Sequence, residues 1–147
     1  MRATLLALAC AGCLDTVGPD VGAPLRASCS SVDSDPATDV HFDADIRIGI
    51  FGRADVHCTR CHTPGGATPI GLDVGGLDLS SEATLVEGGV HGTAIVVPGD
   101  PCSSLLVQKL GEAPPFGARM PLDGPPYLDA LDLQLISDWI AEGAHDN

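Results

Sequence analysis

The chain has 147 residues, a formal net charge of −13 and a sequence pI of about 4.3. Such an acidic chain lacks the basic face that phosphate binding needs, which excludes nucleic acid as a partner and favours docking to basic proteins. Five aromatic residues make a thin core for one small domain, while 18 glycines and 12 prolines indicate a loop-rich fold.

The first residues resemble an export leader, which we place at residues 1–12. Arg2 precedes an apolar run that is far too short to span a bilayer. Cys13 follows an alanine and a glycine, as at a bacterial lipoprotein cleavage site, and Cys10 is an alternative. We therefore expect export to the periplasm or outer surface, with a lipid on Cys13 as a membrane tether. An ordinary secretory leader without lipid is the other interpretation.

Residues 13–41 have the composition of a flexible linker, rich in Asp, Ser, Pro, Ala and Gly. Cys29 lies within it, and cysteines of exported proteins are usually bonded or reactive. A disulfide from Cys29 to Cys102 would pin the linker to the domain. Two unrelated thiols are the alternative, and sequence spacing does not decide between them.

We expect the folded domain at residues 42–147, beginning with a helix from Asp43 to about Gly52. Asp43 or Asp45 would cap this helix, with Phe42 packed in front of the cap. Apolar residues at i, i+4 and i+5 would form its buried face, namely Ile46, Ile50 and Phe51.

A Cys-x-x-Cys-His sequence follows at residues 58–62, and this is the attachment signature of c-type haem. Cys58 and Cys61 can each bond one arm of the same porphyrin, and His62 then reaches the iron from the proximal side. A Cys-x-x-Cys pair also suits a redox dithiol, or a zinc site completed by His57 or His62. The adjacent histidine favours one covalent haem c, whose flat apolar mass would complete the core.

The middle of the chain predicts short elements between turns. A Gly-rich connector at residues 67–89 contains one short helix, residues 82–87, which Ser80 or Ser81 would cap. Residues 95–97 are expected to be extended, and residues 103–110 to form a helix. The glycine pairs belong to no phosphate-binding motif and are interpreted as turns.

A Pro- and Gly-rich loop at residues 111–127 contains Arg119, Met120 and Pro121. A thioether is a common axial ligand of c-type haem and raises its potential. We expect Met120 to be the distal ligand and Arg119 to face a haem propionate. If the distal site is open, His91 is an alternative ligand.

Residues 130–142 are the clearest helix, with Asp129 as its N-cap. Trp139 should pack near the first helix or the porphyrin edge. The apolar face is expected to consist of Leu131, Leu135, Ile136, Trp139 and Ile140.

Taken in order, these motifs resemble class I cytochrome c, and more narrowly the planctomycete-type and myxobacterial single-haem cytochrome c domains. The resemblance implies an all-α fold of short helices and long Gly/Pro-rich loops around one covalent haem. It implies thioether bonds at Cys58 and Cys61, with His62 and Met120 as axial ligands. Besides the Cys-x-x-Cys-His sequence, the shared segments are residues 75–78, 97–101, 104–106, 119–121 and 136–144.

An iron with both axial positions filled has no open site for substrate. We therefore expect a non-enzymatic carrier of single electrons between periplasmic or membrane-associated redox partners. The alternative is a haem sensor, or a ligand-binding or catalytic haem module, with an open distal site. A structural haem module attached to an enzyme subunit is a further possibility.

Overall fold

The structure, a computed structural model, describes residue 29 and residues 34–90 and 94–147. The leader and most of the linker, with Cys10 and Cys13, lie outside the described residues, as does His91. None of the described helices is long and apolar enough to cross a bilayer.

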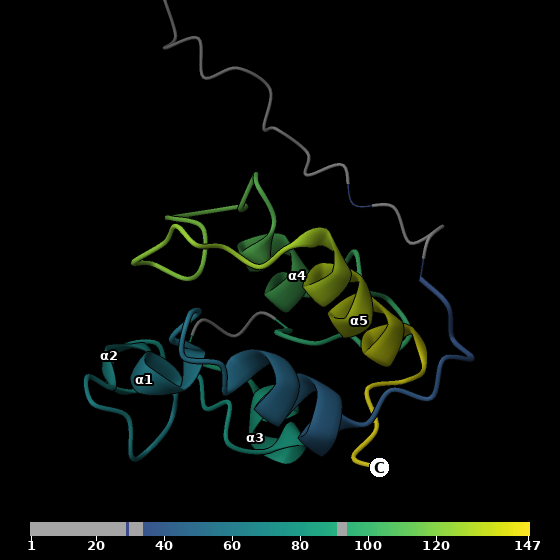
Figure 1. Ribbon diagram of the computed structural model, residues 1–147, viewed down its shortest axis with the longest axis horizontal. Coiled ribbons are helices and arrows are strands. Elements are labelled where there is room, and N and C mark those ends of the chain that lie inside the picture. Colours follow the sequence, from purple (N-terminus) through teal and green to yellow (C-terminus); the bar gives the residue numbers. More distant parts are fainter. Residues whose placement is uncertain (1–28, 30–33, 91–93) are drawn as a thin grey trace, which may run out of the picture.

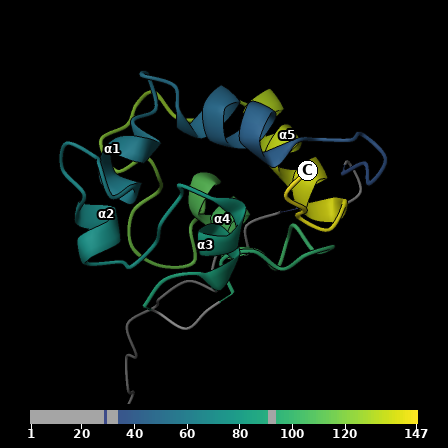
Figure 2. The same cartoon turned by 90° about the horizontal axis from the view of Figure 1, so that it is seen from below.

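The described residues form helices and no strand, which confirms the all-α prediction. Figure 1 shows α1 and α2 at one end of the domain and the C-terminus at the other, and Figure 2 shows the same arrangement from below. In chain order the helices are the π-helix η2 (Phe42–Phe51), α1 (Cys58–His62), α2 (Ile70–Asp73), α3 (Glu82–Glu87), α4 (Leu105–Leu110) and α5 (Ala130–Ala141).

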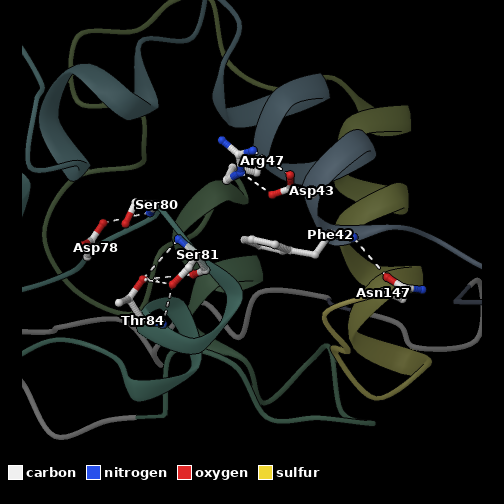
Figure 3. Close-up of polar contacts among 8 residues, drawn as sticks. All are labelled: Phe42, Asp43, Arg47, Asp78, Ser80, Ser81, Thr84 and Asn147. Atoms are coloured by element: carbon white, nitrogen blue, oxygen red, sulfur yellow. Dashed lines mark hydrogen bonds and ion pairs between the residues drawn. The ribbon is translucent and has the colours of Figure 1, made fainter.

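Helix η2 begins one residue earlier than predicted and has a different cap. His41 is the N-cap residue, and Asp45 reaches back to accept its N–H at 2.9 Å. Asp43 does not cap the helix, because its carboxylate pairs with Arg47 one turn along (Figure 3). The predicted apolar face is confirmed, since the buried residues are Phe42, Ile46, Ile50 and Phe51.

Helix α5 has the predicted cap, because the Asp129 carboxylate accepts the N–H groups of Leu131 and Asp132, each at 2.9 Å. Trp139 is fully buried against η2, with its ring centroid 5.2 Å from that of Phe42. The prediction for Leu131 is wrong, since this residue is 80% exposed. The first turn of α5 lies at the edge of the core, where Asp132 pairs with Arg53.

Hydrogen bonds from side chains fix the short elements between these two helices. Ser81 caps α3, and the capping box pairs it with Thr84 (Figure 3). Ser104 is fully buried, and its hydroxyl accepts the Val97 N–H at 2.8 Å and donates to the Asp100 carbonyl at 2.9 Å. Because these bonds hold residues 97–104 as a turn, α4 begins at residue 105 instead of 103.

The connector at residues 67–89 contains a helix, α2, that the sequence did not predict. Its four residues include a glycine, which normally weakens a helix. The predicted extended run at residues 95–97 pairs with no strand within the described part of the chain, and Ile95 and Val96 fill the core instead.

Candidate functional site

Helix α1 presents the two cysteines of the Cys-x-x-Cys-His sequence as free, half-buried thiols. Because Cys58 and Cys61 are three residues apart on a helix, they lie on the same side of it. Cys58 packs against the hydrophobic core, and burial raises the pKa of its thiol to about 11. The Cys58 thiol is therefore protonated at neutral pH until it is bonded.

The imidazole of His62 is oriented by the backbone of two later segments, one at Gly71 and one at Leu77. Its Nδ1 atom lies 3.2 Å from the carbonyl oxygen of Leu77. With the proton on Nδ1, this N–H donates a hydrogen bond to the carbonyl, and the Nε2 lone pair is left available for a metal. Burial lowers the pKa of His62, although the Leu77 carbonyl acts in the opposite direction. The neutral ring that metal ligation requires is therefore favoured.

Gly71 of α2 lies directly against the ring of His62. A Cβ atom at this position would be 2.6 Å from both ring nitrogens. Real Cβ atoms essentially never show such contacts, so only glycine lets the α2 backbone pack this closely. Helix α2 therefore packs directly against the imidazole and limits its movement.

Met120 is half-buried and packs against the core from the loop between α4 and α5. Its N–H donates to the Lys109 carbonyl at 2.9 Å, at the end of α4. Arg119 donates from Nε to the Leu110 carbonyl at 2.8 Å, and its expected contact with a haem propionate stays a prediction. Its guanidinium also lies 4.3 Å from the ring centroid of Tyr127.

Asp123 brings the loop that carries Met120 against helix α1. Its Oδ2 atom is 3.2 Å from Nδ1 of His57 and 3.7 Å from the guanidinium of Arg60. His57 immediately precedes the attachment helix, and Asp123 follows Met120 by three residues. The structure therefore joins the Cys-x-x-Cys-His helix and the Met120 loop at one end of the domain.

The residues present fit a covalently bound haem. Two free thiols lie on one turn of α1, and the adjacent imidazole has one nitrogen held by a carbonyl. Apolar side chains of several elements, including Cys58 and Met120 of the candidate site, pack on the core yet stay partly exposed. These residues are Cys58, Leu77, Val86, Val107, Met120, Leu133 and Leu135.

The zinc interpretation needs further ligands beside the two cysteines. Within the described ranges, no three His, Cys, Asp or Glu side chains are placed to hold a metal ion. His57, one histidine considered for this role, contacts Asp123.

Cys29 and Cys102 form a disulfide, with their Cα atoms 5.4 Å apart and a sequence separation of 73. This bond connects the linker to the start of the segment before α4. Cys58 and Cys61 are the free cysteines among the described residues. Cys29 and Cys102 are therefore used in a cross-link, while Cys58 and Cys61 remain free for attachment of a porphyrin.

Sequence reasoning missed the groups that orient His62. The Leu77 carbonyl leaves no trace in the sequence, since every residue has one. Gly71 has a weak signal in the sequence, as a single glycine inside a short apolar segment after the histidine.

Comparison with known protein families assigns this region. Residues 58–121 match the family model described as planctomycete cytochrome C. The match begins at Cys58 and ends at Pro121, directly after Met120, so it spans both parts of the candidate site. Neither the curated proteins nor the solved structures gave a match. The match over residues 58–121 is consistent with a planctomycete-type cytochrome c domain, and this family implies covalently bound haem c.

Proposed function

We propose that this c-type cytochrome carries one haem and transfers electrons singly between redox partners, and that it is not an enzyme. The main support is the pairing of His62 Nδ1 with the Leu77 carbonyl, beside two free thiols on the same helix. This arrangement orients an imidazole as an axial ligand and leaves two sulfurs for covalent attachment.

Each residue has a distinct role in this proposal. Cys58 and Cys61 form the two thioether bonds, and His62 is the proximal ligand. Met120 would be the distal ligand, and its loop would then close the site to substrates and water. Haem c, when bound, supplies a centre that gains or loses one electron, with a potential that the axial ligands and burial adjust. The protein's contribution is to hold both ligands in place.

The acidic surface is proposed to guide docking to basic redox partners. The net charge of the chain is −13, and three of its arginines lie within ion-pair distance of a carboxylate of the domain. These pairs are Arg47 with Asp43, Arg53 with Asp132, and Arg60 with Asp123. Export, with a lipid on Cys13 as a membrane tether, belongs to the same proposal.

Carbon monoxide binding tests the proposal, because a closed distal site excludes the gas. The protein is produced in a host with haem-attachment machinery, reduced, and exposed to carbon monoxide. We expect no binding by the native protein and clear binding by Met120→Ala, which serves as the positive control. Rapid binding by the native protein would instead support a sensor or ligand-binding haem module with an open site.

Salt dependence tests the docking part separately. Electron exchange with a basic redox protein should slow as added salt shortens the Debye length below about 8 Å. A rate that does not change with ionic strength would contradict electrostatic guidance, while leaving the assignment of the axial ligands intact.

A further inference from the structure

We propose that Lys109 is the residue that positions Met120: from the end of α4 it holds the distal-ligand loop at three alternate residues. The inference rests on the proposed function, in which Met120 closes the distal side of the site. It adds a residue that neither touches the iron nor belongs to any motif.

Lys109 binds the loop through both its side chain and its backbone. Its ammonium donates to the carbonyl oxygens of Phe116 at 2.8 Å and Ala118 at 2.6 Å. Its own carbonyl accepts the N–H of Met120 at 2.9 Å. The ammonium also lies 4.9 Å from the ring centroid of Phe116. One residue therefore engages positions 116, 118 and 120, which include the ligand itself.

These bonds form because a helix end leaves groups unsatisfied. The last four carbonyls of an α-helix have no partner within the helix. In α4 the carbonyl of Lys109 receives the Met120 N–H, and that of Leu110 receives the Arg119 side chain. The ligand loop thus serves as the C-terminal cap of α4, and the position of Met120 is fixed relative to that helix.

The ammonium makes the stronger part of this attachment. Lys109 is half-buried, and its ammonium donates to two carbonyl oxygens. Hydrogen bonds from an ionised donor are roughly twice as strong as neutral ones. The loop is otherwise rich in Gly and Pro, and no regular element holds residues 111–127.

A looser loop would open the distal site more often. An added ligand competes with the Met120 sulfur, so its apparent affinity rises in proportion to the fraction of open protein. Lys109→Met removes two charge-assisted hydrogen bonds, and the loss of one alone corresponds to roughly tenfold in such an equilibrium, so about tenfold is the smallest effect we expect. Imidazole is a suitable probe, because it binds haem iron but makes no specific contact with the loop.

The test compares Lys109→Met, which keeps the aliphatic stem, with the native holoprotein. We expect imidazole binding that is tighter by about tenfold or more, a weaker sulfur–iron absorption band, a lower reduction potential and faster hydrogen exchange at the Met120 amide. Lys109→Arg retains a charged donor and should restore most of the native behaviour. Arg47→Met removes the same charge from an exposed pair on η2 and should leave imidazole binding unchanged.

Native-like imidazole affinity and amide exchange in Lys109→Met would overturn the inference. The native protein gives a second measurement if that variant does not fold: its Met120 amide should exchange as slowly as the amides of α4, and fast exchange would contradict the proposal. A native spectrum that lacks the sulfur–iron band would overturn the assignment of Met120, and this inference with it. An intact native band, with no effect of Lys109→Met, would overturn the role of Lys109 alone.

Discussion

The Nδ1 atom of His62 lies 3.2 Å from the carbonyl oxygen of Leu77, fifteen residues further along the chain. The same segment returns a second bond, because the N–H of Leu79 donates to the His62 carbonyl at 2.8 Å. The His62 carbonyl therefore binds the segment at residues 77–79, and the Leu77 carbonyl of this segment orients the His62 side chain. Leu79 is buried in the core, which fixes the whole arrangement to the body of the domain.

Gly71→Ala should disturb the proximal side without removing any ligand. The new Cβ would lie 2.6 Å from both ring nitrogens of His62, so the ring or α2 must move by about 1 Å to reach ordinary contact. We expect covalent haem to remain while the low-spin signals in electron paramagnetic resonance shift or broaden.

Gly65→Ala is the matched control, because no heavy atom lies within 4 Å of the Cβ it would add. Its spectrum should equal that of the native protein. Identical spectra for Gly71→Ala and the native protein would show that His62 does not occupy the position described.

The ion pair between Arg53 and Asp132 should stabilise the domain, because it joins the end of η2 to the first turn of α5. Arg53 donates to Asp132 at 2.7 Å, and the Asp132 side chain is only 12% exposed. Its second oxygen, Oδ2, is buried without a hydrogen bond from the described residues. Arg53→Leu would leave a mostly buried carboxylate unpaired, and should cost about 2 kcal/mol of unfolding free energy.

Asp132→Asn should lower the unfolding free energy by less, about 1 kcal/mol or below. The amide oxygen can still accept a hydrogen bond from Arg53, and Asp55 remains as a charged partner of Arg53. Arg47→Leu breaks a solvent-accessible pair on η2, in which the Asp43 side chain is 60% exposed, and should not change stability measurably. Urea unfolding of the three variants gives the order, and equal losses in all three would refute it.

Removing the disulfide should lower stability through the unfolded state. A bond across 73 residues restricts the unfolded chain by about 4 kcal/mol in the loop-entropy model. The double variant Cys29→Ser/Cys102→Ser should therefore unfold at markedly lower urea concentration, with its haem spectrum retained. A spectrum that changes with the loss of this bond would mean that Cys102 also shapes the haem site.

Met120→Ala should keep covalent haem but lose the sulfur–iron absorption band at the red end of the spectrum. The reduction potential should fall, since a thioether ligand raises it. Leu122→Ala, which shortens an exposed apolar side chain two residues away, should retain the band. A band that survives in Met120→Ala would exclude this residue as the ligand.

Sequence rules that involve only neighbouring residues were sufficient to predict helix caps. Asp129 and Ser81 cap the helices that the sequence assigned to them, because a capping side chain needs only the N–H groups that follow it. The Cys-x-x-Cys-His sequence identified its own chemistry, and the family match supports that identification.

Contacts between distant segments could not be predicted in this way. The periodicity of α5 includes Leu131, but no pattern shows that the core ends before that residue. Likewise, Lys109 resembles any helix-end lysine in the sequence, and only the folded loop brings two carbonyls to its ammonium. The carbonyl that orients His62 is equally invisible to sequence reasoning.

The intact mass of the purified protein, with a pyridine haemochrome spectrum, tests the central claim most directly. Protein matured in a competent host should be red and heavier than the apoprotein by one haem, and Cys58→Ser/Cys61→Ser should carry none. Colourless protein with the mass of the bare chain, from a host that matures other c-type cytochromes, would contradict the account.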